Sequence, residues 1–86
     1  MARGTIEVNH PEGLHARPAA DFVKLANRFK SAVIVRVGSR EANGKSIMSV
    51  MGLGANAGTR VDLDVQGEDA DQAYEALETF LTGRSA

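Results

Sequence analysis

The chain has 86 residues, of which 43% are hydrophobic and 24% charged, and this composition predicts a single folded domain over residues 1–86 rather than a disordered segment. It contains no cysteine, which excludes disulfides and thiolate metal sites. The formal net charge is only −1, but residues 1–45 carry eight Lys or Arg against four acidic residues, so the first half is locally basic.

No stretch of the sequence is suited to a membrane. The longest purely aliphatic run, Ala32–Val35, is far shorter than the roughly 20 residues of a membrane-spanning helix. The N-terminus also lacks the apolar stretch of a secretory signal. We therefore expect a cytoplasmic protein with no membrane insertion.

The first part of the chain predicts a strand, a turn and a helix. Apolar and polar residues alternate over Gly4–Asn9, which indicates a half-buried strand, and the turn residues His10–Gly13 follow it. From Ala19 to Phe29 the apolar residues recur with the spacing of an amphipathic helix. Pro18 then belongs to the first turn of this helix, where its missing N–H costs nothing, and the helix should begin on one side or the other of Arg17.

The middle of the chain predicts a tight pair of strands and a short helix. Val33, Val35 and Val37 alternate with Ile34 and Arg36, which predicts a strand. Arg40–Asn43 returns from the turn that follows, so these two strands should be antiparallel. Ser46 is suited to cap a short helix that runs to about Leu53.

The last part predicts one more strand and one more helix. Thr59–Gln66 alternates, with Asp62 and Asp64 on the polar face, and Asp69–Gln72 matches a capping box at the start of a helix that ends near Gly83. The element order is therefore βαββαβα. Because every strand has one apolar face, we expect an α+β fold in which three helices cover one face of the sheet and the other face stays wet.

A candidate reactive site lies at the start of the first helix. The free amides and the positive end of the helix dipole favour an anion such as phosphate, and they disfavour a protonated imidazole at His15. A neutral imidazole can attack phosphorus, and the guanidinium of Arg17 can stabilise phosphoryl oxygens. On spacing alone, an alternative stays open in which His15 only caps the helix and Arg17 is a solvated charge.

Two motifs, Gly13–Ala19 (Gly-Leu-His-Ala-Arg-Pro-Ala) and Lys45–Met51 (Lys-Ser-Ile-Met-Ser-Val-Met), together resemble HPr, the histidine-containing phosphocarrier of the bacterial phosphoenolpyruvate-dependent sugar phosphotransferase system. The resemblance covers nearly the whole chain. It implies an open-faced sandwich with strand order 1-4-2-3 in a wholly antiparallel sheet. It also implies that His15 accepts a phosphoryl group on Nδ1 from phosphorylated Enzyme I and passes it to the IIA domain of a sugar permease. Such a chain is a covalent carrier rather than an enzyme that turns over small molecules.

The surface beside His15 is a candidate for docking. The basic face of the first helix adjoins His15, which favours an acidic partner, although an ordinary solvated face is the open alternative. In the second helix Met48 points away from Val50, and flexible exposed thioethers suit a surface that contacts several partners. The basic face consists of Arg17, Ala20, Lys24 and Arg28. The predicted partner-binding residues are Ala16, Ala20, Lys24, Arg28, Ile47, Met48 and Met51.

The resemblance further implies regulatory phosphorylation of Ser46 by an HPr kinase/phosphorylase, with a transcriptional regulator as an additional partner. In the alternative interpretation, Ser46 is only a helix cap. A phosphate there adds a charge of roughly −1.5 to −2 at a helix N-terminus, where the dipole stabilises it, so any inhibition must act at the partner interface. Ser49 stands where the family often has glycine or lysine, a difference that bears on partner preference.

Other chemistries find little support. The outward strand residues include Glu7, Asp62 and Asp64, which would repel RNA from the sheet. His10 and His15 have no third ligand at a recognisable spacing, so we expect no metal and no cofactor, and His10 is predicted to be an exposed loop residue. Stacking platforms for bases are also missing, because all four aromatic residues fall in predicted helices: Phe22, Phe29, Tyr74 and Phe80.

Three functions stay open beside a sugar-branch phosphocarrier. One is the nitrogen-branch paralogue of the same fold, which relays phosphate for regulation. The second is a regulatory protein-binding module, and the third is a segment of a fused protein with several phosphoryl-transfer domains. The stretch Lys45–Met48 favours the sugar branch. We expect the chain to be a monomer.

Overall fold

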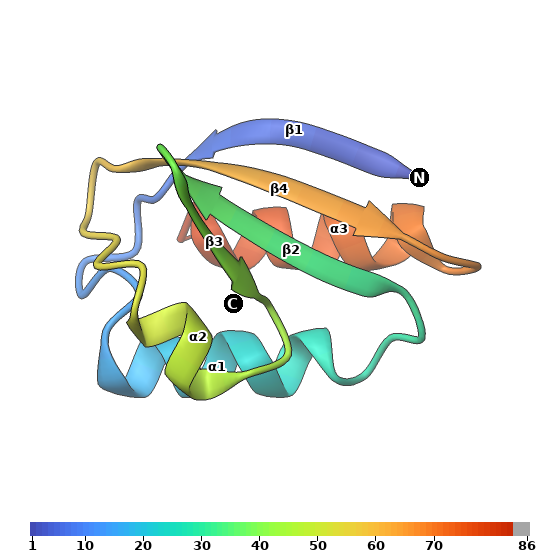
Figure 1. The fold of residues 1–86 in the computed structure, drawn as a ribbon, viewed down its shortest axis with the longest axis horizontal. Coiled ribbons are helices and arrows are strands. Elements are labelled where there is room, and N and C mark those ends of the chain that lie inside the picture. The colour runs from blue at the N-terminus through green and yellow to red at the C-terminus, as the bar shows by residue number, and fades with distance from the viewer. Residues whose placement is uncertain (84–86) are drawn as a thin grey trace.

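The computed structural model describes residues 1–83 and has the predicted element order (Figure 1). The elements are β1 (Ala2–Glu7), α1 (Ala16–Ala26), β2 (Ala32–Val37), β3 (Arg40–Asn43), α2 (Ile47–Met51), β4 (Arg60–Gln66) and α3 (Ala70–Leu81).

The four strands form one antiparallel sheet in the order β1-β4-β2-β3, as the family resemblance implied. In register, Ile6 lies opposite Val61, and Val33 lies opposite Val65. The three helices lie on one side of this sheet: α3 packs on β1 and β4, α1 packs on α3, and α2 contacts α1 and β3 (Figure 1). The predicted α+β open-faced sandwich is therefore confirmed.

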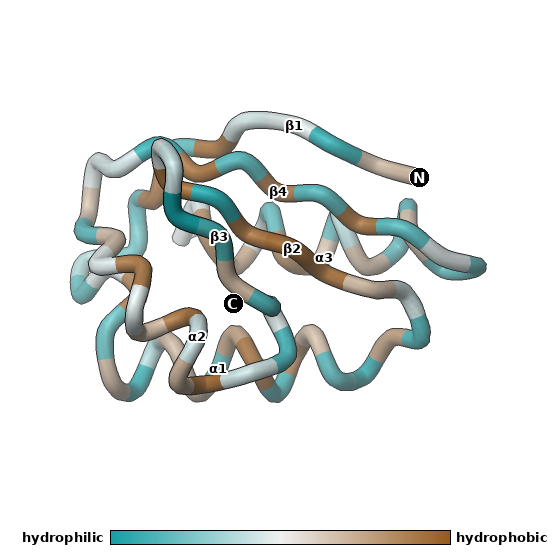
Figure 2. Tube along the Cα trace, in the orientation of Figure 1, coloured by the Kyte–Doolittle hydropathy of each residue, from teal (hydrophilic) through white to brown (hydrophobic). Residues whose placement is uncertain are grey.

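The core fills the space between the sheet and the helices. Hydrophobic and hydrophilic residues alternate along β4 (Figure 2). In β2, which is mostly hydrophobic, Val33 and Val35 are buried and their neighbours are more exposed. The helices contribute their apolar stripes to the same core. The largest completely buried side chains include Leu14, Phe22, Leu63, Leu77 and Leu81. Within residues 1–83, none of the helices combines the length and the hydropathy that are needed to cross a membrane.

The first helix is shorter at its C-terminus than predicted, because α1 ends at Ala26 and Phe29 lies in the turn that follows. At this end of the helix, the Asn27 side-chain amide donates to the Val23 carbonyl and to the Lys45 carbonyl. The next amide bonds span only three residues, from Phe29 to Ala26 among others, which tightens the end of the helix. Phe29 still packs against the core from its turn.

The predicted capping box at the start of α3 does not form. Asp69 is the N-cap residue, but its carboxylate makes no capping bond to the helix. It accepts instead from the Lys30 amide at 2.9 Å, and from the Ser31 amide at 2.9 Å and hydroxyl at 2.5 Å. Three donors on the α1–β2 connection outcompete the local cap. These bonds fasten the start of α3 to the segment that enters β2.

Gly67 makes this junction possible. Its φ is +151°, and a Cβ there would lie 2.6 Å from Cα of Ser31, closer than two carbon atoms can approach without a shift. Ser31 itself is almost completely buried. The glycine therefore lets the end of β4 pass directly over the serine that Asp69 holds.

The open face of the sheet is less wet than predicted at one position. Asp64 points to this face from β4, yet it is only 7% exposed. Arg36 Nη1 lies 3.6 Å from its carboxylate and Arg3 Nε lies 3.7 Å away, so the two arginine side chains cover it from the neighbouring strands. Glu41 holds Arg36 in place through a 2.8 Å ion pair across β2 and β3.

Candidate functional site

His15 is the N-cap residue of α1. Its backbone is extended, with φ −101° and ψ 165°, and the first intrahelical bond runs from the Ala19 amide to the His15 carbonyl. Pro18 occupies the first turn, as predicted, so the amides of Ala16 and Arg17 are left without intrahelical partners. The His15 side chain makes no capping bond, and it is exposed. The imidazole is therefore free to face an anion held at this helix end.

The His15 ring has one protein partner within residues 1–83. Its Nε2 lies 2.6 Å from Oδ1 of Asn56, a residue 41 positions later in the chain. Asn56 was not among the predicted site residues, because its stretch shows only the composition of a loop. No carboxylate of the described chain bonds to the His15 ring, so an amide oxygen occupies the orienting position.

The loop that carries Asn56 is docked firmly on the loop that carries His15, and Figure 1 shows the two side by side at the N-terminal end of α1. The Leu14 amide donates to the Ala55 carbonyl at 2.8 Å, and both residues are fully buried. Gly13 has φ +64°, and a Cβ there would lie 2.6 Å from the Ala55 carbonyl oxygen. Only glycine satisfies both the backbone angle and the close approach.

The predicted basic face of α1 is on the surface. Arg17, Lys24 and Arg28 are exposed, Ala16 is exposed and Ala20 is half-buried. None of the three basic side chains forms an ion pair within the part of the chain that the structure describes. Their charges are thus available to an external partner.

The apolar residues predicted for docking lie on α2, which packs beside α1. Val50 is the buried contact of this helix, and Leu53 just beyond it is also buried. The exposed fractions of the other apolar side chains are large, at 43% for Ile47, 81% for Met48 and 40% for Met51. Exposed apolar surface that adjoins free positive charge is typical of a contact area for other proteins.

Ser46 is the N-cap of α2, as predicted, and its hydroxyl accepts from the Ser49 amide at 3.4 Å. The helix ends at Met51, two residues earlier than predicted. Lys45 connects this helix start to the end of α1, because its Nζ donates to the Phe29 carbonyl at 2.7 Å and its own carbonyl accepts from Asn27 at 3.3 Å. The start of α2 is therefore fixed relative to the basic face of α1.

His10 lies in a loop, as predicted, but it is half-buried rather than exposed. Its ring stacks on Phe80 of α3, with the ring centroids 5.4 Å apart and an interplanar angle of 26°. Its Nδ1 is buried and has no hydrogen-bond partner within residues 1–83. The His10 ring thus packs on α3, and the His10 carbonyl accepts from the Gly13 amide to close the turn before His15.

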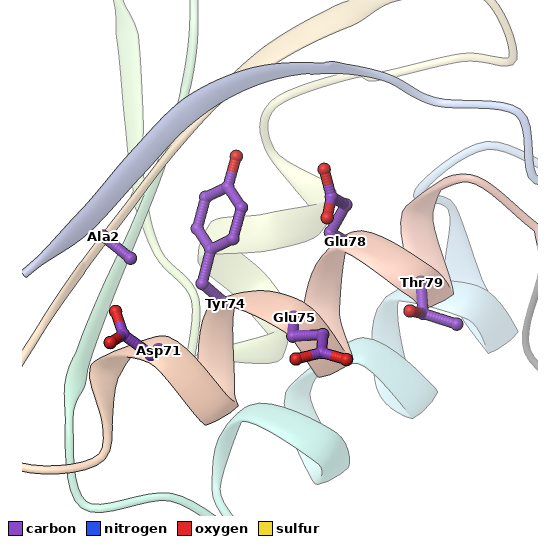
Figure 3. A pocket seen from close by; sticks show the side chains of 6 residues that line it. All are labelled: Ala2, Asp71, Tyr74, Glu75, Glu78 and Thr79. Atoms are coloured by element: carbon purple, nitrogen blue, oxygen red, sulfur yellow. The ribbon is translucent and has the colours of Figure 1, made fainter.

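A surface hollow between the start of β1 and α3 has the wrong chemistry for phosphate (Figure 3). Burial, and then the nearby Glu78 carboxylate, raise the pKa of Tyr74. No basic side chain of the described residues lines the hollow, and none of the predicted site residues belongs to it. Its lining residues are Ala2, Asp71, Tyr74, Glu75, Glu78 and Thr79.

Comparisons with known proteins agree with this geometry. The family model described as "PTS HPr component phosphorylation site" matches residues 2–83. Phosphocarrier protein HPr of Lysinibacillus sphaericus is 53% identical over 72 residues, which is 84% of this chain and 82% of that protein. A crystal structure of HPr-C-His from Thermoanaerobacter tengcongensis is 39% identical, with a TM-score of 0.91 and 100% of both chains covered.

A third similar protein is Crh, the catabolite repression protein of Bacillus subtilis. Its crystal structure is 42% identical to this chain, covers 100% of this chain and 99% of its own, and has a TM-score of 0.81. In that crystal structure Crh is an intertwined dimer with a swapped domain.

The matched fold and phosphorylation-site model define the class of protein, which is a phosphocarrier of the phosphotransferase system. Within that class, the chain belongs to the HPr family, as its two sequence motifs predicted.

Proposed function

We propose that His15 is the phosphoryl acceptor, which takes the group from phosphorylated Enzyme I and gives it to the IIA domain of a sugar permease. The observation that carries this proposal is the exposed imidazole at the N-cap of α1, beside two amides with no intrahelical partner. That arrangement supplies a nucleophile and an anion site in a single turn. The site requires no metal or cofactor for this step, and we place the protein in the cytoplasm.

The transfer is an in-line displacement at phosphorus. The lone pair of the His15 ring forms a new N–P bond while the bond between phosphorus and the donor group of Enzyme I breaks, and the donor group leaves with that electron pair. The ring keeps its other N–H. The free amides of Ala16 and Arg17, together with the Arg17 guanidinium, stabilise the phosphoryl oxygens. A second in-line displacement delivers the group: a nucleophile of the next protein attacks phosphorus, the N–P bond breaks, and the His15 nitrogen recovers its lone pair.

Enzyme I and the IIA domains dock, in this proposal, on the surface that α1 and α2 share. The unpaired charges of Arg17, Lys24 and Arg28 favour acidic partners, and the exposed Ile47, Met48 and Met51 supply an apolar centre. Ala16 and Ala20 are small residues on the same face, and they leave room for a partner to approach His15. The docking surface defined by these residues adjoins the acceptor.

We also propose that phosphorylation of Ser46 by an HPr kinase/phosphorylase regulates this relay. The half-buried hydroxyl caps a helix that lies inside the docking surface, so a phosphate there changes the charge that partners meet. The modified surface would suit a different partner with a basic contact area, such as a transcriptional regulator.

A regulatory variant is the second candidate function, since Crh is described as a catabolite repression protein and is 42% identical to this chain. A nitrogen-branch carrier differs from both in the partner that receives the phosphate. For the working state we propose a monomer. The domain-swapped state of Crh makes light scattering the direct check of this assembly.

The test of the relay is incubation with phosphoenolpyruvate and Enzyme I, followed by measurement of acid-labile phosphate. We expect one acid-labile phosphoryl group on the parent chain, because a P–N bond is hydrolysed in acid whereas phosphoserine survives. His15→Ala should carry none, and Arg17→Ala should carry the group but acquire it more slowly. If His15→Ala still passes phosphate from Enzyme I to a IIA domain, the assignment of the acceptor is wrong.

A further inference from the structure

We propose that Asn56 is a positioning residue for phosphoryl transfer: it accepts the Nε2–H of His15 and thereby presents Nδ1 as the nucleophilic nitrogen. The inference rests on the proposed role of His15 as acceptor, and it adds to that role the group that selects the ring nitrogen.

The bond to Asn56 determines which nitrogen of the His15 ring carries the proton. An amide oxygen can only accept a hydrogen bond, so Oδ1 of Asn56 at 2.6 Å requires that His15 Nε2 carries hydrogen. A neutral imidazole has one N–H, and the other nitrogen then holds the lone pair in the plane of the ring. The bond to Asn56 therefore favours the tautomer in which Nδ1 is unprotonated and able to attack phosphorus. Nε2 keeps its hydrogen, and its bond to Asn56, after transfer.

The loop that carries Asn56 is rigid. Asn56 is itself held by a reciprocal pair of bonds, since its amide donates to Thr59 Oγ1 at 3.1 Å and its carbonyl accepts from the Thr59 amide at 3.0 Å. The same loop is joined to the end of β1, where Val8 bonds both to Thr59 at 2.8 Å and to Gly58 at 2.6 Å. The amide that orients the ring is thus mounted on a closed turn fixed to the sheet.

The loop that carries Asn56 also packs directly on the loop that carries His15. Gly13, two residues before His15, packs directly on the backbone of Ala55 and Asn56, and a Cβ there would lie 2.8 Å from Cα of Asn56. The Leu14 amide donates to the Ala55 carbonyl immediately beside this contact. The backbones that carry His15 and Asn56 therefore have a fixed separation, which keeps the bond between the two side chains short. Because the ring is already oriented, little side-chain entropy is lost when the phosphoryl group is transferred.

The decisive experiment is nitrogen NMR of the His15 ring, with the ring neutral, in the unphosphorylated chain. In the parent we expect Nε2 to have the shift of a protonated nitrogen and Nδ1 that of an unprotonated one. Asn56→Ala should bring the two shifts toward each other, because the exposed ring then exchanges between tautomers. Asn56→Asp, which keeps an acceptor of the same reach, should restore the parent pattern. Asn9→Ala is the matched control, since the Asn9 side chain is exposed and makes no hydrogen bond to another residue of the described range 1–83.

In the transfer assay, Asn56→Ala should slow phosphorylation of His15 by roughly 3- to 10-fold, which corresponds to one ordinary hydrogen bond. Asn56→Asp should restore the tautomer but not the rate, because its charge opposes the incoming phosphoryl group. The inference is overturned if the parent ring carries its hydrogen on Nδ1, if Asn56→Ala leaves the ring shifts unchanged, or if Asn56→Asp fails to restore them. Because the NMR measurement involves no phosphate donor, its failure is distinct from failure of the relay itself.

Discussion

At the scale of single residues, the His15 side chain contributes little to the fold, because its one described bond is the exposed contact with Asn56. The His15 side chain makes no capping bond to α1, and its ring is exposed, so removal of the ring opens no cavity. We therefore expect His15→Ala to leave the melting temperature within about 2 °C of the parent, since a change below about 0.5 kcal/mol shifts a small domain only slightly. A helix cap would have cost about 1 kcal/mol. A large fall in melting temperature, measured by circular dichroism, would contradict this expectation.

Residue roles were predictable from the sequence only where local pattern carries them. His15 and Arg17 could be singled out as candidates because a histidine and an arginine next to a helix-starting proline form a local motif. Asn56 could not be found, because its contact with the ring depends on how a distant loop docks, and one asparagine among glycines and alanines predicts only a turn. His10 was mistaken for an exposed residue for the same reason, since Phe80, on which it stacks, belongs to the last helix of the chain.

At the scale of elements, Asp69 connects α3 to the α1–β2 connection, and this link should be sensitive to acid. The Ser31 hydroxyl, then the Lys30 and Ser31 amides, lower the pKa of Asp69 from 3.8 to about 2. Because the folded pKa lies below the unfolded one, the carboxylate stabilises the fold fully above about pH 4, and this contribution is lost as the pH falls toward 2.

This predicts that Asp69→Asn lowers stability at neutral pH, and that the difference from the parent shrinks between about pH 4 and pH 2. Urea unfolding at a series of pH values measures the free energy of unfolding of both proteins, and hence how their difference changes with pH. Asp71→Asn is the control, because the Asp71 side chain is exposed in the first turn of α3 and makes no hydrogen bond to another residue in the stretch 1–83. A difference between parent and Asp69→Asn that stays constant down to about pH 2 would refute the role of this carboxylate.

Ser46 also acts at the scale of an element, since it begins α2. An aspartate at this position can still cap the helix, and its charge interacts favourably with the helix N-terminus. We expect Ser46→Asp to keep or raise the melting temperature, yet to slow phosphorylation of His15 through weaker binding of Enzyme I. Ser39→Asp adds the same charge in the β2–β3 turn, away from α2. It should neither raise the melting temperature nor slow the phosphorylation of His15. Ready unfolding of Ser46→Asp, or unchanged phosphorylation, would refute regulation at this site.

The types and order of the elements were predictable because alternation in strands and the period of the helices are local properties. Errors arose where a side chain from elsewhere replaced a local bond. The carboxylate of Asp69 leaves its own helix start for three donors near Ser31, which no capping pattern contains. Likewise, Asp64 looked solvated in sequence because its two arginine partners belong to other strands.

At the scale of the whole molecule, the fold separates a side with unpaired positive charge and exposed apolar groups from a side whose charges are paired. The open face of the sheet satisfies its own charges, with Asp64 between Arg3 and Arg36 and a 2.7 Å bond from Thr5 to Asp62. The hollow beside α3 carries carboxylates and, among the described residues, no basic lining side chain. Unpaired positive charge and exposed methionine occur together on α1 and α2, so this side is where an acidic partner with an apolar centre would bind.

We therefore predict that Lys24→Glu combined with Met48→Asp weakens binding of Enzyme I by at least about tenfold, roughly 1.4 kcal/mol, and leaves the fold intact because both side chains are exposed. Calorimetric titration of Enzyme I measures the loss. Raising the salt should weaken binding by the parent more than by the variant, since the screening length falls from ~10 Å at 0.1 M to ~3 Å at 1 M. Arg60→Glu with Ser39→Asp makes the same change in net charge at exposed positions outside the docking surface, and it should bind almost as the parent does. Equal losses of affinity in the two double variants would mean that Enzyme I responds to total charge alone. An NMR map that placed Enzyme I on the open face of the sheet would contradict the proposed docking surface.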